Sequence, residues 1–180
     1  MEKTKRFEGK VVLITGAATG LGEACALRFA EEGANIICVD INETENSKTA
    51  EACSEYGVSS ADITRDVTDP TGADETVSSI LKEFGRLDIL VCSAGLYTGS
   101  PIDEVTLEGW QRIIDINLTG TFLYNKAVST AMVSQKSGSI INISSMAGKT
   151  SWPASFEYSA SKSGVIGLTR SMAMELAPYG

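Results

Sequence analysis

Short runs of β-branched and other apolar residues alternate along the chain with longer stretches in which apolar residues recur at helical spacing. This pattern predicts strands near residues 10–15, 35–40, 59–65, 87–93 and 138–144, and helices near residues 21–32, 43–56, 70–84, 107–136 and 155–177. Strands that alternate with helices are parallel and are joined by right-handed crossovers. The runs 11–14 and 36–39 are apolar at every position, as a sheet covered on both faces requires. We therefore predict an α/β fold with a doubly wound parallel sheet in a three-layer α/β/α sandwich.

Polar residues at the predicted helix starts support these boundaries. Asn42 is placed to cap the second helix, with Glu45 three residues later to complete a capping box. Asp69 and Pro70 predict a cap and a first-turn proline at the third helix, and Thr106 predicts a cap for the fourth. Because no repeat, low-complexity tract or linker interrupts the pattern, we predict a single domain over residues 1–180.

The composition excludes several classes of protein. With 43% hydrophobic and 21% charged residues, the 180-residue chain is typical of a globular domain and not of a disordered or fibrous one. Fifteen Lys and Arg against 23 Asp and Glu give a net charge of −8, which makes nucleic acid and anionic membranes poor partners. The chain has no histidine, which excludes Ser-His-Asp and Cys-His catalytic groups and most zinc sites.

Two further features indicate the compartment. The N-terminus lacks the apolar core of a signal peptide, and no apolar run is long enough to span a bilayer. The four cysteines are widely spaced and are interpreted mainly as reduced, buried thiols (Cys25, Cys38, Cys53 and Cys92). We expect a cytoplasmic protein.

A glycine-rich turn follows the first predicted strand. Gly16, Gly20 and Gly22 have the spacing G-x-x-x-G-x-G where a strand meets a helix. Such a turn directs free backbone N–H groups and the positive helix end at a pyrophosphate. Gly16 would make the tight turn, Gly20 would admit the phosphates, and Gly22 would let helix and strand approach. The alternative is that these glycines serve only a tight turn.

An acidic residue ends the second predicted strand. A carboxylate at Asp40 can accept hydrogen bonds from both hydroxyls of an adenosine ribose and would repel a 2′-phosphate. Residues 17–19 and 41–43 contain no Lys or Arg that could receive such a phosphate. The charges therefore favour NAD over NADP.

The last predicted helix carries a tyrosine and a lysine on one face. Tyr158 and Lys162 are spaced i and i+4, so an ammonium can lie near a phenol and favour its phenolate form. Ser144 and Ser145 follow the fifth predicted strand, where ligands bind in α/β sheets. Each of these features has a structural alternative: a surface Tyr–Lys pair, and serines that serve a turn or cap a helix.

Taken together, these motifs resemble the short-chain dehydrogenase/reductase family over essentially the whole chain. The resemblance is carried by the glycine turn with Thr15, by Asp66-Val67, by Asn117-Leu118-x-Gly120, by the spacing from Ser145 to Tyr158 and by Tyr158-x-x-x-Lys162. It implies a Rossmann-like NAD(P)-binding domain and an oxidoreductase that interconverts a secondary alcohol and a ketone by hydride transfer without a metal.

The resemblance also implies roles for individual residues. Tyr158 would be the general acid/base, Ser145 would hold the substrate oxygen, and Lys162 would bind the nicotinamide ribose. Asn117 would position a water that links Lys162 to solvent; its alternative is a kink or core-polar role. The implied cofactor contacts are Gly16, Thr19, Gly20, Leu21, Gly22, Asp40, Asp66, Val67, Ser93, Ala94, Gly95, Tyr158 and Lys162.

The sequence departs from the family pattern at two places. The family's Asn-Asn-Ala-Gly reads Cys92-Ser93-Ala94-Gly95 here, so Ser93 can offer only a hydroxyl. The family continues beyond the position of Gly180 with further strands and a substrate lid. We therefore expect the final strands to be absent from this chain, and the chain to be part of a longer protein.

The expected partner is a small alcohol or ketone. The pocket wall is expected to be apolar and aromatic and to consist of Leu96, Tyr97, Met146, Trp152 and Phe156. Glu157 is expected to face outward. Gly164 and Gly167 suggest the close approach of another helix, within one subunit or in the homodimers and homotetramers that the resemblance implies. The alternatives are a 3-oxoacyl-carrier-protein reductase and a non-catalytic dinucleotide-binding or scaffold protein.

Overall fold

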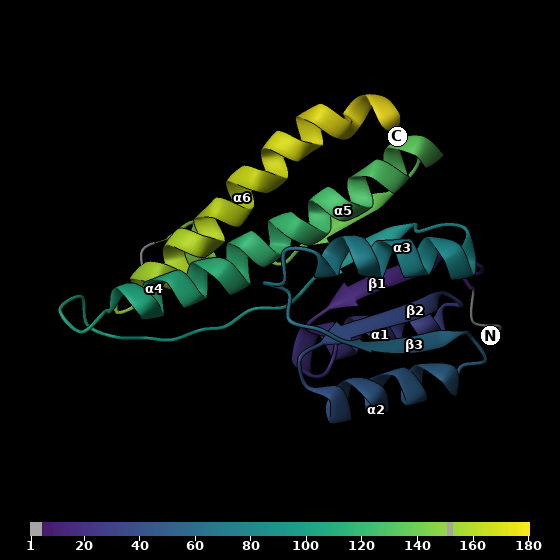
Figure 1. Ribbon diagram of the computed structural model, residues 1–180, viewed down its shortest axis with the longest axis horizontal. Helices are drawn as coiled ribbons and strands as arrows, with labels where there is room; N and C mark the ends of the chain where they lie inside the picture. Colours follow the sequence, from purple (N-terminus) through teal and green to yellow (C-terminus); the bar gives the residue numbers. More distant parts are fainter. Residues whose placement is uncertain (1–4, 151–152) are drawn as a thin grey trace.

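The computed structural model describes residues 5–150 and 153–180 (Figure 1). Five parallel strands form one sheet in this part of the chain. The strands are β1 (Val11–Thr15), β2 (Asn35–Asp40), β3 (Ser60–Thr64), β4 (Ile89–Cys92) and β5 (Ser139–Asn142). Their order is β3-β2-β1-β4-β5, so the direction of winding reverses between β1 and β4. In doubly wound sheets, ligands bind beyond the carboxyl ends of the strands at such a reversal. The predicted strands and fold class are confirmed.

Helices follow each strand and cover both faces of the sheet. They are α1 (Gly20–Glu31), α2 (Glu43–Ser54), α3 (Gly72–Phe84), α4 (Leu107–Ile114), α5 (Gly120–Gln135) and α6 (Phe156–Leu176). Short helical turns are η1 (Asp115–Thr119), η2 (Met146–Gly148) and η3 (Ala177–Tyr179). Because successive side chains of a strand point to opposite faces, Val12 and Ile14 pack with the α1 and α2 side, while Val11 and Leu13 pack with α3 and α5. Both faces are buried, which explains the unbroken apolar runs.

The start of the third helix and the capping box of the second differ from the prediction. The third helix begins at Gly72 and not at Pro70, because Asp69 Oδ1 accepts hydrogen bonds from the backbone N–H and the hydroxyl of Thr71 and forms a turn before the helix. At the second helix, Asn42 Oδ1 accepts from the Glu45 N–H as predicted, at 3.3 Å. The capping box is not completed, because the Glu45 carboxylate pairs with Lys48.

The fourth predicted helix, near residues 107–136, is divided into three parts. Thr106 Oγ1 caps α4 by accepting from the Gly109 N–H at 3.0 Å, as predicted. The helix then widens into the π-helical turn η1 before it continues as α5. Single π turns within α-helices are frequently found at functional sites, and this one contains Asn117.

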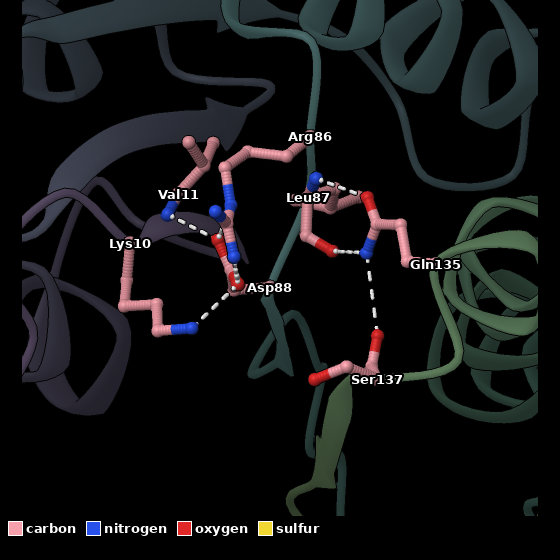
Figure 2. A network of polar contacts seen from close by, with 7 residues as sticks. All are labelled: Lys10, Val11, Arg86, Leu87, Asp88, Gln135 and Ser137. Carbon is pink, nitrogen blue, oxygen red and sulfur yellow. Dashed lines mark hydrogen bonds and ion pairs between the residues drawn. The ribbon is translucent and has the colours of Figure 1, made fainter. Parts of the chain in front are cut away.

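A polar network holds the amino ends of β1 and β4 (Figure 2). The Asp88 carboxylate accepts hydrogen bonds from the Val11 N–H, from Lys10 and from Arg86. On the other side of Figure 2, the Gln135 amide bonds to both backbone groups of Leu87. Burial acts to raise the pKa of the Asp88 carboxyl group, but the hydrogen bonds from Arg86, Val11 and Lys10 together outweigh it and lower that pKa. This network fixes the sheet at the end opposite to the glycine turn.

Candidate active site

The glycine turn has the geometry of a close approach between backbone segments. Gly16 (φ +69°) and Gly20 (φ +63°) both lie in the left-handed region, which favours glycine. A Cβ on Gly20 would point into open space, whereas one on Gly22 would lie 1.9 Å from the Gly16 carbonyl oxygen. Only glycine at residue 22 therefore lets α1 start against the turn, and the space over Gly20 is open for a ligand.

A cavity of about 1210 Å³ extends from this turn across the carboxyl ends of β1, β2 and β4. Most of the predicted cofactor contacts line it, namely Gly16, Thr19, Leu21, Asp40, Asp66, Val67, Ser93, Ala94 and Gly95. Gly20 and Gly22 belong to the turn itself. The sequence did not indicate the opposite wall, which α4 and η1 supply with Leu107, Glu108, Gln111, Arg112, Asp115 and Ile116.

Two acidic residues of the cavity, Asp40 and Asp66, are held by local hydrogen bonds. Asp40 Oδ2 accepts from the Ala18 N–H at 3.1 Å and Oδ1 from the Asn42 N–H at 2.9 Å. Each carboxylate oxygen can accept more than one hydrogen bond, so Asp40 retains acceptors for ligand hydroxyls. Asp66 Oδ1 accepts from the backbone N–H and the hydroxyl of Thr68. Both carboxylates are thus oriented before any ligand arrives.

Glycine at residue 120 allows the start of α5 to pack closely against Val67. Val67 is buried, and a Cβ on Gly120 would lie 2.8 Å from Val67 Cγ2. The glycine three residues after Asn117 therefore lets the start of α5 pack against the cavity floor. On the same floor, Ser93 is held through its backbone N–H, which donates to the Thr15 carbonyl oxygen at 3.1 Å.

The Tyr158–Lys162 pair lies next to this cavity. Lys162 is 4% exposed, its Nζ is 5.7 Å from the centroid of the Tyr158 ring, and it donates to the Ile143 carbonyl oxygen at 2.9 Å. Burial lowers the pKa of the Lys162 ammonium. A Cβ on Gly95 would lie 3.4 Å from Lys162 Nζ, so the lysine lies close to a residue that lines the cavity.

The two serines after β5 have different contacts. Ser144 Oγ donates to the Lys162 carbonyl oxygen at 2.8 Å and so ties the strand to α6. Ser145 Oγ accepts from the Ala147 N–H at 3.2 Å and caps η2. Since it acts there as an acceptor, the Ser145 hydroxyl keeps its proton for donation to a ligand oxygen.

Asn117 is fully buried and its side chain joins two segments. Its Oδ1 accepts from the Leu96 N–H at 2.7 Å, and its Nδ2 donates to the Leu96 carbonyl oxygen and to Ser161 Oγ. A Cβ on Gly95 would lie 3.4 Å from its Oδ1. Asn117 thus holds the segment after β4 against α6, close to Lys162, through contacts that fit the core-polar alternative.

The expectation for Glu157 is wrong. Its side chain does not face outward: the residue is 3% exposed and Oε1 accepts from Thr98 Oγ1 at 2.9 Å. Helical position alone did not reveal this, because the segment after β4 folds over the first turn of α6. Of the predicted wall, Trp152 lies outside the described residues, while Tyr97, Met146 and Phe156 are exposed side chains.

The glycines of α6 have different surroundings. A Cβ on Gly164 would lie 2.6 Å from the Leu118 side chain, so the approach of another helix occurs within the subunit. A Cβ on Gly167 would meet nothing within 4 Å among the described residues. No helix in the described part of the chain is both long and apolar enough to cross a membrane.

The doubly wound sheet has a glycine turn of the phosphate-binding type where its winding reverses, and a half-buried tyrosine paired with a buried lysine lies beside that turn. This combination defines an α/β oxidoreductase. The family model for short chain dehydrogenases matches residues 10–180. The chain belongs to the short-chain dehydrogenase family, as the sequence motifs predicted.

Similar proteins include a 3-oxoacyl-[acyl-carrier-protein] reductase of Synechocystis, 40% identical over 95% of this chain and 70% of that protein. A galactitol 2-dehydrogenase of Agrobacterium fabrum is 39% identical over 97% of this chain and 68% of that protein. Among solved structures, an NAD⁺-bound xylitol dehydrogenase has a TM-score of 0.95 and 39% identity, over 97% of this chain and 68% of that one. The chain thus spans about 70% of the length of these relatives.

Proposed function

We propose that the protein is an NAD(H)-dependent oxidoreductase that interconverts a secondary alcohol and a ketone. The observation that carries the proposal is the position of Gly95, which lines the cavity next to the glycine turn and lies so close to Lys162 that a Cβ on it would be 3.4 Å from Nζ. A dinucleotide bound along the cavity would therefore end beside the Tyr158–Lys162 pair. The names of the relatives, among them galactitol, D-threitol and sorbitol dehydrogenases, support this class of reaction.

The residues present fit NAD. The open space over Gly20 and the free acceptors of Asp40 suit a pyrophosphate and a ribose diol, and similar structures are described as NAD complexes. Arg65 also lines the cavity, but its guanidinium is paired with Asp69 and Glu75. Since Asp40 carries the charge that a 2′-phosphate would meet, NAD is favoured over NADP. When bound, NAD supplies a hydride acceptor.

The proton chemistry is assigned to residues of this chain. Tyr158 Oη takes the hydroxyl proton of the alcohol, or returns it to the ketone oxygen in the reverse direction. The Ser145 hydroxyl donates to the same oxygen and stabilises the developing alkoxide. Lys162 favours the phenolate of Tyr158 by its charge and binds the nicotinamide ribose. Asn117 is proposed to position the water that links Lys162 to solvent.

The substrate wall combines Leu96 from the cavity with the exposed side chains of Tyr97, Met146 and Phe156. This surface suits a small alcohol or ketone of modest polarity. The second candidate is a 3-oxoacyl-carrier-protein reductase, since relatives from Synechocystis and Thermotoga maritima bear that name. The net charge of −8 disfavours it, because the carrier protein is itself acidic.

The remaining parts of the proposal concern assembly and location. We propose one domain over residues 1–180, a cytoplasmic location, and a homodimer or homotetramer. Of the two glycines of α6, Gly167 is available for a helix of another subunit, since Leu118 occupies the space at Gly164. Light scattering that shows a monomer at micromolar concentration would refute the oligomer.

The function is tested by separate fluorescence titrations with NADH and NADPH, followed by assays on a panel of secondary alcohols and on a 3-oxoacyl carrier substrate. We expect tighter binding of NADH, turnover of secondary alcohols, and loss of turnover in Tyr158→Phe with retained NADH binding. Tighter NADPH binding would overturn the role given to Asp40. Unchanged turnover in Tyr158→Phe would refute the mechanism. Binding without turnover on any substrate would favour a scaffold protein.

A further inference from the structure

Glu157 is a buried carboxylate next to the proposed acid/base. It lies in the first turn of α6, directly before Tyr158, and is 3% exposed. Its Oε1 accepts from Thr98 Oγ1, but its Oε2 is buried without a hydrogen-bond partner among the described residues. Burying a carboxylate with so few partners is unfavourable, although the positive end of α6 offsets part of the charge. A neutral side chain at this position would avoid that penalty.

The carboxylate cannot touch a substrate directly, because Oε2 is sealed from solvent and Oε1 is taken by Thr98. Its hydrogen bond is to Thr98, so the contact through which it can order the neighbouring segment is the one with Thr98. Thr98 lies in the segment 96–99, which runs from the floor of the cavity to the exposed side of the substrate wall.

Three other contacts hold this segment. The Asn117 amide bonds to both backbone groups of Leu96, at 2.7 and 2.9 Å. The Tyr97 hydroxyl lies 3.3 Å from Ser155 Oγ. The Tyr97 ring meets the Tyr158 ring edge to face, with centroids 5.0 Å apart and planes at 84°. The segment therefore packs directly against the tyrosine that carries the proton.

We propose that Glu157 is a positioning residue which, through Thr98, fixes the segment 96–99 and so holds Tyr97 against the ring of Tyr158. Segment 96–99 is exposed at Tyr97, Thr98 and Gly99, and the Asn117 bonds hold only Leu96, so the bond to Glu157 is the one that fixes Thr98. The inference rests on the proposed function, since it assigns Tyr158 the proton transfer.

The test uses the full chain and four variants. Thr98→Val removes the donor at nearly constant shape, and Glu157→Ala removes the acceptor. Glu157→Gln keeps an oxygen that accepts from Thr98. Glu175→Gln, on the exposed last turn of the same helix, is the matched control. Steady-state kinetics, NADH titration, thermal unfolding and hydrogen exchange of a peptide that covers residues 96–99 are measured for each.

We expect Thr98→Val and Glu157→Ala to lower kcat about tenfold or more, because small misplacements of reacting groups have effects of this size. NADH affinity should stay close to wild type, and exchange at residues 96–99 should be faster. Tm should fall in Thr98→Val, because the buried Glu157 carboxylate loses its hydrogen-bond donor. Glu157→Gln and Glu175→Gln should behave like wild type, with an unchanged pH profile of kcat/KM.

Unchanged kcat and exchange in Thr98→Val would overturn the inference, and this variant decides the question even if Glu157→Ala does not fold. Loss of rate in Glu157→Gln equal to that in Glu157→Ala, or a shifted pH profile, would also overturn it, because the charge and not the contact would then matter. A wild-type protein without turnover would refute the proposed function, and hydrogen exchange would still report whether Glu157 orders the segment.

Discussion

Asp88 offers the sharpest test of how the fold is held. Its carboxylate is 6% exposed and accepts from the Val11 N–H at 3.0 Å, from Lys10 Nζ at 3.0 Å and from Arg86 Nε at 2.7 Å (Figure 2). Val11 is itself buried, so Asp88→Ala leaves its N–H without a partner and without water. The two cations are partly exposed and can return to solvent.

These contacts set the size of the effect. An unsatisfied buried N–H is unfavourable by about 1–3 kcal/mol. Each partly exposed ion pair adds about 0–1 kcal/mol. The expected loss in Asp88→Ala is therefore about 3 kcal/mol of unfolding free energy, or a fall in Tm of roughly 6–12 °C for a chain of this size. Asp88→Asn keeps an acceptor for Val11, so its loss should be about 1 kcal/mol.

Urea and thermal unfolding of both variants measure these losses, with Asp103→Ala, an exposed loop residue, as the control. The pKa of Asp88 is lowered in the folded state, so the stability that its charge contributes is fully present above the unfolded-state pKa of about 3.9. It is lost as the pH falls through the folded-state pKa. The gap between wild type and Asp88→Asn should be constant near neutral pH and narrow below about pH 4. A loss in Asp88→Ala no larger than in the control would refute the reasoning.

Three further predictions concern the glycine turn, the cap of α2 and the cysteines. Gly22→Ala should lose about 3 kcal/mol or more of unfolding free energy, or fail to fold, because its Cβ would lie 1.9 Å from the Gly16 carbonyl oxygen. Urea unfolding measures this loss, and an unchanged midpoint would contradict the prediction. Asn42→Ala should lose about 1 kcal/mol with the cap of α2, and an unchanged unfolding midpoint would contradict this. In the native protein, a thiol reagent should modify the partly exposed Cys25 before the buried thiols of Cys38, Cys53 and Cys92. Reaction of all four thiols at the same rate would contradict this, because it would show that the core opens.

Much of the fold could be predicted because its signals are local. The apolar runs at 11–14 and 36–39 need two covered faces wherever they lie, and the capping side chains of Asn42 and Thr106 act within three residues of their own position. The start of α3 was predicted two residues too early because two local signals compete there. Asp69 can cap a helix or form a turn with Thr71, and sequence alone does not decide between these two local bonds.

The candidate site was predictable as a set of residues but not as a set of contacts. The glycine turn, Asp40 and Ser145 lie at or just after the carboxyl ends of parallel strands, and these ends share one edge of the sheet. Lys162 of α6 reaches the same edge, because its Nζ donates to the Ile143 carbonyl oxygen after β5. The wall supplied by α4 left no signal, because its exposed residues are typical of any amphipathic helix.

The sequence by itself determined the order of strands and helices, the glycine turn and the acidic end of β2, since backbone conformation and charge belong to single residues and their neighbours. Only the tertiary structure decided that α4 faces the cavity, that Asn117 lies in a π turn and joins Leu96 to α6, and that Glu157 is buried under Thr98. These features depend on which segments cover one another, and such long-range packing is a property of the whole fold and not of a local pattern.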